Sequence, residues 1–253
     1  MKMATHPIHI NDQWVTIVGE VSNPRFVWIT DRIGLQIARD KEGYGFDSRD
    51  QLAVFSVGTF ENVRLFLDLK RSEFSSVQAF VFMMLGQDEL AVDAPPPGFN
   101  DVVEGWFHPK GPRQIKTDKD VPSVMASYAA LLDSALSQFP GATFFTTEPA
   151  MRRSGFGFAV RRAVRIGRLE RRDDQRHHHM IVGRHLYGRR RGKGTGLGDG
   201  GLLPIKEHFF ETDSVMLKEA TLREILGRMR DVVDAALRPQ GDPASIDDVK
   251  FVY

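Results

Sequence analysis

The segment 151–201 constrains the fold of this chain more than any other part of the sequence. It holds 14 of the 34 lysine and arginine residues and only four acidic residues, a local net charge of +10, whereas the whole chain of 253 residues carries +1. The rest of the sequence is therefore mildly acidic. Because local charge decides what a surface attracts, this segment is a better guide to the molecule than its near-neutral total.

The apolar residues of this segment repeat with a period of two. Phenylalanine, valine and isoleucine alternate with arginine, glycine and alanine over residues 156–167, which predicts a long strand with one apolar face and one arginine-bearing face. A polar turn at Arg171–Arg176 would lead into an antiparallel return strand at Met180–Tyr187. Gly188–Gly201 contains seven glycines in fourteen residues, which predicts a loop.

The remaining elements follow from hydrophobic periodicity and capping residues. Strands are expected at residues 14–19, 26–30, 33–38, 52–57, 102–108 and 143–147. Helical segments are expected within Thr59–Leu85, Asp120–Phe139 and Asp213–Leu237; in the first of these, Thr59 caps Phe60–Leu69 and an all-apolar helix follows at Val77–Leu85. The sequence thus predicts an α+β protein, with a mainly antiparallel sheet packed against three or four helices, a long Arg-rich β-ribbon and a Gly-rich loop.

Three consecutive prolines at residues 95–97 interrupt the chain and favour a linker. They divide the sequence into an N-terminal strand-then-helix region, 1–95, and a C-terminal region, 96–253, which contains the basic ribbon (151–201) and the long terminal helix. One continuous domain is the alternative.

Composition excludes several classes of protein. The chain is 42% apolar and 26% charged and contains no cysteine, which excludes wholesale disorder, disulfide scaffolds and Cys-ligated metal sites. No apolar stretch approaches the roughly 20 residues of a membrane span, so no membrane partner is expected. The polar N-terminus lacks the apolar core of a signal peptide, so we expect a cytoplasmic protein.

The arginine-rich segment favours a phosphate-binding surface, because guanidinium groups pair bidentately with phosphate. We therefore predict a non-enzymatic protein that binds RNA or single-stranded DNA. The residues expected to contact phosphates are Arg161, Arg165, Arg168, Arg171, Arg172, Arg189, Arg190, Arg191 and Lys193. In an alternative interpretation the protein is an assembly protein, whose basic ribbon docks on the acidic surface of a partner such as another copy in a homo-oligomer.

A second alternative comes from the loop Arg191-Gly192-Lys193-Gly194-Thr195-Gly196. Its pattern R-x-x-G-x-G resembles the acetyl-CoA pyrophosphate loop of the GCN5-related acyltransferase family. The resemblance implies an acyltransferase in which Arg191, Gly192, Gly194 and Gly196 hold the cofactor. It also implies a strand at Met180–Tyr187 before the loop and a helix beginning within Leu202–Phe210 after it.

The histidine cluster His177-His178-His179 has no established metal-binding spacing. At most His177 and His179 would share a face of a strand, with His185 across a hairpin. We predict no metal and no cofactor, and expect these histidines to extend the basic surface as the pH falls through about 6.5. Nucleophile-elbow, P-loop and Rossmann motifs are all missing from the sequence, so it favours a binding protein over an enzyme.

Overall fold

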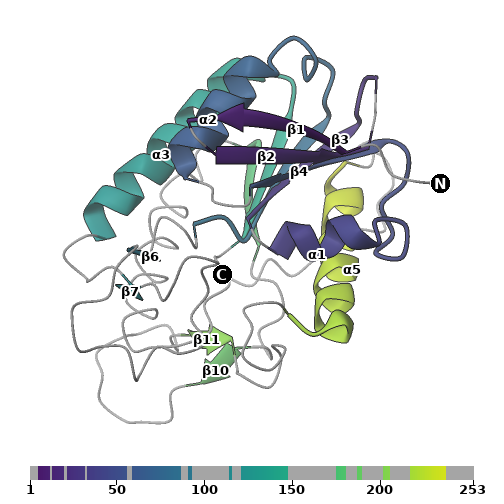
Figure 1. Ribbon diagram of the computed structural model, residues 1–253, viewed down its shortest axis with the longest axis vertical. Coiled ribbons are helices and arrows are strands. Elements are labelled where there is room, and N and C mark those ends of the chain that lie inside the picture. The colour runs from purple at the N-terminus through teal and green to yellow at the C-terminus, as the bar shows by residue number, and fades with distance from the viewer. Residues whose placement is uncertain are drawn as a thin grey trace.

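The computed structural model describes the parts of the chain that form a central sheet and its covering helices (Figure 1). The described residues are 5–11, 13–19, 22–31, 33–55, 59–86, 91–92, 114–115, 121–147, 175–180, 187–189, 202–205 and 217–237. The proline linker and the expected strands at 102–108 and 156–167 lie outside these residues, so the division into two regions stays a prediction.

Seven strands form the central sheet in the order β1-β2-β4-β3-β5-β8-β9. They are β1 (Thr5–Ile10), β2 (Gln13–Val18), β3 (Phe26–Thr30), β4 (Asp50–Phe55), β5 (Ala79–Met83), β8 (Thr143–Thr147) and β9 (His177–Met180). β1 and β2 form an antiparallel hairpin, and β2 runs antiparallel to β4. Every further neighbouring pair, from β4 across to β9, is parallel.

This topology corrects the predicted fold class. Four of the six strand pairs are parallel, so the sheet is mixed and mostly parallel, not mainly antiparallel. Parallel neighbours need crossover connections, and α1 (Ile33–Arg39) and α2 (Phe60–Leu69) lie between consecutive parallel strands in the chain. The molecule is a doubly wound α/β protein, with helices on both faces of the sheet.

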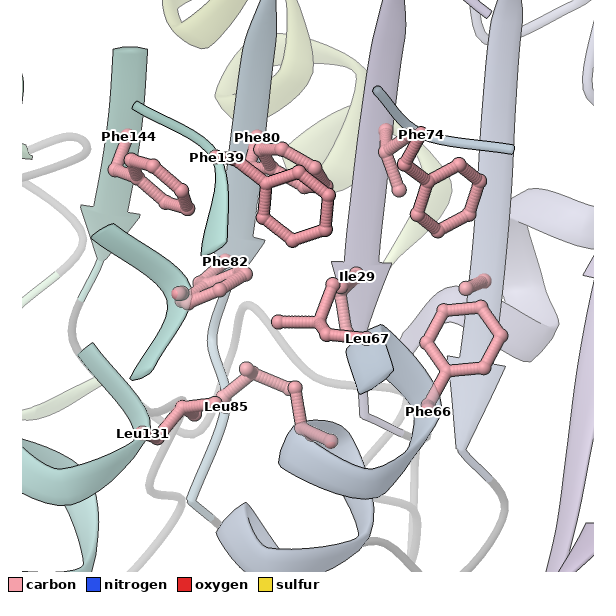
Figure 2. Close-up of a cluster of buried hydrophobic side chains, with 14 of the residues drawn as sticks. Ile29, Phe66, Leu67, Phe74, Phe80, Phe82, Leu85, Leu131, Phe139 and Phe144 are labelled. Carbon is pink, nitrogen blue, oxygen red and sulfur yellow. The ribbon is translucent and has the colours of Figure 1, made fainter. Parts of the chain in front are cut away.

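The two helices α2 and α3 (Val121–Gln138) cover one face of the sheet (Figure 1). Aromatic rings from the strands and from the ends of these helices fill the space between the layers (Figure 2). Phe80 of β5 stacks on Phe144 of β8 with ring centroids 5.1 Å apart and also contacts Phe139 at 4.7 Å. Phe74, on the other side of Phe80, lies 6.0 Å away.

The helices α1 and α5 (Glu219–Ala236) cover the opposite face (Figure 1). Their apolar side chains, including Ile33, Ile37, Leu222 and Leu226, pack on residues of the strands such as Trp28. Helix α5 also carries two ion pairs on its outer side, Glu219–Arg223 and Glu224–Arg228, each 2.7 Å long. No helix in the described part of the chain is long and apolar enough to cross a membrane.

Residues 33–38 were expected to form a strand, but they lie in helix α1. The helix approaches the sheet so closely that a Cβ atom on Gly34 would lie 1.7 Å from the Thr30 hydroxyl oxygen and 2.9 Å from a methyl group of Val54. A crossover from β3 to its parallel neighbour β4 must cover the sheet face, and a glycine at this position allows the helix to do so.

The expected helix at Val77–Leu85 is also wrong, because Ala79–Met83 forms the central strand β5. All five of its residues are buried, as is typical of a parallel strand with both faces covered. Such a strand is apolar throughout, so its hydrophobic pattern cannot be distinguished from that of a buried helix. The helix predicted from Asp213 begins at Glu219, and Lys218 caps it without a side-chain hydrogen bond.

Two short two-stranded sheets complete the described structure. β6 (Ala91–Val92) pairs with β7 (Gln114–Ile115), and β10 (Tyr187–Arg189) pairs antiparallel with β11 (Leu202–Ile205). The prediction of one antiparallel return strand at Met180–Tyr187 is therefore wrong. Met180 ends β9, which is parallel to β8, and Tyr187 begins a different sheet.

Candidate functional site

The strand order defines a switch point at the carboxyl ends of β3 and β5. After β3 the chain returns through α1 to β4 on one side of β3, and later returns as β5 on the other side. In open α/β sheets, ligands bind outside the carboxyl ends of the strands where the winding direction reverses. The residues that follow β3 and β5 are therefore the first candidates for a functional site.

Asp31 follows β3 directly at this position. It is only 2% exposed, and carboxylates are rarely buried unless they have a structural or chemical role. Its backbone carbonyl accepts hydrogen bonds from the Gly34 N–H at 2.9 Å and from the Thr30 hydroxyl at 3.2 Å. These contacts join the end of β3 to the beginning of α1 and keep Asp31 at the edge of the sheet.

The chain leaves β5 through a strained residue. Met84 has a φ of +54° and Gly86, two residues later, a φ of +108°. The left-handed conformation costs a non-glycine residue about 1–2 kcal/mol, and such strain is concentrated at functional sites. The Met84 N–H donates to the hydroxyl oxygen of Thr147 at the end of β8, at 2.7 Å. This buried hydrogen bond holds the strained turn in place.

Asp31, Met84 and Thr147 consequently lie at the ends of three adjacent parallel strands. Thr30 is paired with Met83, and Phe82 with Thr146, so the three residues follow one another across β3, β5 and β8. Neighbouring strands are roughly 4.8 Å apart. We call Thr30, Asp31, Met84 and Thr147 the carboxyl-edge site; it combines one carboxylate, two hydroxyls and a strained backbone turn.

None of these residues was identified from the sequence. The signal that could have found Asp31 is an acidic residue directly after the buried run Phe26–Thr30. An acidic residue at this position indicates a candidate site only when β3 is known to be a central parallel strand. Met84 and Gly86 were assigned to the end of a helix, which concealed the turn after β5.

The structure describes one of the nine predicted phosphate-binding residues. Arg189 is the last residue of β10, where it pairs with Leu202. The other predicted residues lie outside the described residues: Arg161, Arg165, Arg168, Arg171, Arg172, Arg190, Arg191 and Lys193. The same holds for the expected cofactor loop, Arg191, Gly192, Gly194 and Gly196.

The acyltransferase interpretation requires a helix after that loop. Residues Leu202–Ile205 instead form β11, a strand antiparallel to β10. A strand offers no helix N-terminus to bind a pyrophosphate, so the structural context implied by the resemblance is missing there.

Arg176, a described residue of the basic segment, binds the end of helix α3. One guanidinium nitrogen of Arg176, Nη1, donates to the carbonyl oxygens of Leu136, Phe139 and Pro140 at 3.0–3.4 Å, where α3 ends. A basic side chain that caps the last carbonyls of a helix is stabilising. Arg176 is therefore part of the scaffold.

Two histidines of β9, His177 and His178, are also part of the scaffold. The Nε2 atom of His177, which is 7% exposed, lies 3.0 Å from the hydroxyl oxygen of Thr146. His178 stacks on Phe145 with ring centroids 5.3 Å apart. Burial lowers the pKa of His178 below its usual 6.5, so this imidazole resists protonation rather than adding to a basic surface. Among the residues that the structure describes, no group of three or more His, Asp or Glu could hold a metal ion.

No protein-family model matches the sequence, and no curated protein matches it either. Several solved structures resemble the fold. A protein from Streptococcus pneumonia, provisionally described as a platelet activating factor, has 11% identity and a TM-score of 0.49, covering 85% of this chain and 86% of that one.

Two enzymes are also similar in fold. An acetyl xylan esterase, Est2A, from Butyrivibrio proteoclasticus has 10% identity and a TM-score of 0.45, covering 85% of this chain and 65% of that one. The Cif epoxide hydrolase from Acinetobacter nosocomialis has 12% identity and a TM-score of 0.30, covering 71% of this chain and 81% of that one. At these identities the likeness concerns the fold and carries no activity to this chain.

The predicted non-enzymatic binding of RNA or single-stranded DNA is wrong. Two of the matching solved structures are hydrolases by name, and in the described part of the basic segment Arg176, His177 and His178 are engaged within the fold. Neither alternative, the acyltransferase or the assembly protein, is supported. Self-association stays a prediction.

Proposed function

We propose that the protein is a hydrolytic enzyme whose reaction takes place at the carboxyl-edge site. The observation that carries the proposal is the position of Asp31, a carboxylate-bearing residue that is 2% exposed and lies directly after the strand at which the winding of the sheet reverses. A doubly wound sheet binds its ligands at this point.

The turn after β5 determines which residue would do the chemistry. In α/β-hydrolases with a nucleophile elbow, the nucleophile occupies a strained turn of this kind. Here that turn carries Met84, whose thioether cannot serve as an acid, a base or an oxygen nucleophile. A cysteine nucleophile is excluded as well, because the chain contains none. The reactive group of the described site is therefore the Asp31 carboxylate.

Asp31 acts as a general base in this proposal. Its carboxylate takes a proton from a water molecule while the water oxygen attacks the carbonyl carbon of an ester. The tetrahedral intermediate then collapses, the bond to the alcohol oxygen breaks, and the proton passes from Asp31 to the departing alcohol. The products are a carboxylic acid and an alcohol, and Asp31 is regenerated. The hydroxyls of Thr30 and Thr147 supply polar groups beside this reaction.

The test compares two aspartates at opposite ends of the sheet. Hydrolysis of p-nitrophenyl acetate is followed by release of p-nitrophenolate for the wild type, Asp31→Asn and Asp234→Asn. Loss of a general base lowers kcat by about 10²-fold or more, so we expect that loss in Asp31→Asn. Asp234 is exposed on α5 near Arg49, which precedes β4, so Asp234→Asn should retain wild-type kcat.

Thermal unfolding of both variants verifies that they are folded. A folded Asp31→Asn protein with wild-type kcat would remove Asp31 from the chemistry. A wild-type protein that hydrolyses neither the p-nitrophenyl ester nor an acyl thioester would refute the hydrolytic function itself.

A further inference from the structure

The strand β1 forms one border of the central sheet. It pairs with β2 on one side, and no strand in the described part of the chain pairs with its other side. Pro7 and His9 of this strand are both exposed. An uncovered edge strand presents backbone N–H and C=O groups that can pair with a strand of another molecule. The outer side of β1 is therefore a surface on which a further strand could dock.

The register of the β1–β2 hairpin decides which backbone groups of β1 point outward. Ile10 pairs with Gln13 across a two-residue turn, and Asn11, the first residue of that turn, has the positive φ, +46°, that such turns favour. The pair that closes a two-residue turn exchanges both of its hydrogen bonds, and bonded and non-bonded pairs alternate from there along the strands. Every second residue of β1 therefore directs its backbone groups away from β2. These residues are Thr5, Pro7 and His9.

Pro7 is the middle one of these three residues, and it has no backbone N–H. This costs the hairpin nothing, because Pro7 and its partner Thr16 form one of the pairs that exchange no hydrogen bond. On the outer side, the pyrrolidine ring takes the place of a hydrogen-bond donor. A strand docked there would lose the central hydrogen bond of its ladder and would meet the ring instead. Prolines within sheets are confined to edge positions of this kind.

The sequence of β1 contains no other feature that protects an edge. Natural edge strands are often very short or carry charged side chains, whereas β1 is six residues long and contains no Lys, Arg, Asp or Glu. Beside the border lies Trp14 of β2, which is 53% exposed and contacts His9 with ring centroids 4.9 Å apart. An exposed aromatic ring beside an uncharged edge favours docking, so the proline is the feature of β1 that opposes it.

We propose that Pro7 keeps β1 of one molecule from pairing with β1 of a second copy. A second copy is the partner that fits this border, because pairing about a two-fold axis brings the same patch of both molecules together and runs the two strands antiparallel. With the axis at residue 7, Thr5 of one copy would face His9 of the other. The two prolines would meet at the centre, where both hydrogen bonds are lost. This interaction surface is separate from the hydrolytic function.

The experiment measures self-association of the full chain by sedimentation velocity over a series of protein concentrations. Pro7→Thr and Pro7→Val each restore the backbone N–H and supply a β-branched side chain, which is favoured in strands. Each pair of molecules would gain two hydrogen bonds, so the association constant should rise about tenfold or more above that of the wild type. Each variant is compared with the wild type at the same concentration, so association through another surface affects all samples alike.

Pro140→Thr is the matched control. Pro140 is an exposed proline that follows α3, so its replacement should leave self-association at the wild-type level. Dilution should reverse the association of the Pro7 variants, because folded molecules pair through a formed edge. The proposal is overturned if both Pro7 variants sediment like the wild type at every concentration, or if Pro140→Thr associates as strongly as they do. Aggregates of the Pro7 variants that persist on dilution would also count against it, since they indicate association of unfolded chains.

Discussion

The two faces of the central sheet are closed by different interactions. The face under α2 and α3 is filled by interlocking aromatic rings, with Phe80 in contact with Phe74, Phe139 and Phe144 (Figure 2). The face under α1 and α5 also has an apolar core, but it contains the buried polar residues Lys41 and Asp50, with the half-buried Arg230 bound to Asp50. We refer to them as the aromatic face and the mixed face.

The comparison shows why a buried carboxylate alone does not identify a functional site. Asp50 and Asp31 are equally buried, each 2% exposed. Asp50, at the beginning of β4, accepts from Arg230 and from the Asp47 N–H at 3.0 Å, and these contacts tie α5 and a loop to the sheet. Asp31 follows the end of β3, where the winding reverses. The direction of the strands, and not burial, separates the structural carboxylate from the candidate catalytic one.

The largest effect is expected on the aromatic face. Phe80→Ala would remove a fully buried ring at the centre of the cluster, and the surrounding rings, fixed by one another, cannot close the cavity. We expect the free energy of unfolding to fall by about 3–5 kcal/mol, measured by urea denaturation. Leu69→Ala, at a 58% exposed position of α2, should change it by less than about 0.5 kcal/mol. Equal losses in the two variants would show that the aromatic face does not hold the layers together.

A smaller effect is expected for the ion pair of the mixed face. Asp50→Asn would keep the shape of the side chain but leave the Arg230 guanidinium without its carboxylate. Hydrogen bonds to charged groups contribute about 1.5–3 kcal/mol, and the free energy of unfolding should fall by that amount. Glu73→Gln breaks an exposed pair with Lys70 and should cost about 0–1 kcal/mol. A cost for Asp50→Asn no larger than this would mean that the mixed face depends on its apolar contacts alone.

Several elements could be predicted because local signals determine them. Thr59 caps α2 by accepting from the Asn62 N–H at 3.2 Å, and the helix ends at Leu69 as expected. The strand β8 spans Thr143–Thr147, as its β-branched and aromatic residues predicted. Helix α3 also lies where its apolar stripe placed it. In each case the neighbours in the sequence carry the information.

The fold class could not be predicted because it depends on which strands become neighbours. β5 pairs with β3, more than fifty residues earlier, and with β8, more than sixty residues later. The five apolar residues of β5 are consistent with a helix until both of its faces are known to be covered. The carboxyl-edge site was missed for the same reason, since Asp31, Met84 and Thr147 come together only through that pairing. The local net charge of residues 151–201 is conspicuous in the sequence, but it carries no information on which strands pair with one another.

The smallest effect, and the sharpest test of the mixed face, is the pH dependence from His178. This imidazole packs on Phe145, a member of the apolar core under α5, and burial lowers its pKa below 6.5. Below pH 6.5 the unfolded chain therefore binds a proton at this residue more readily than the folded protein does. Linkage then requires stability to fall as the pH drops from 6.5 through the lowered pKa, and to receive no contribution from this residue at higher pH.

His178→Phe and His178→Gln both remove the titrating group, the first with an apolar ring and the second with a polar chain. Both should flatten the loss of unfolding free energy between pH 6.5 and pH 5, measured by urea denaturation at a series of pH values, whatever their stability at pH 8. If the packing of the imidazole were responsible instead, only the glutamine variant would differ from the wild type, and by the same amount at every pH. A slope unchanged in both variants would mean that the folded protein accepts a charged imidazole at position 178 as readily as water does, so that burial does not lower its pKa.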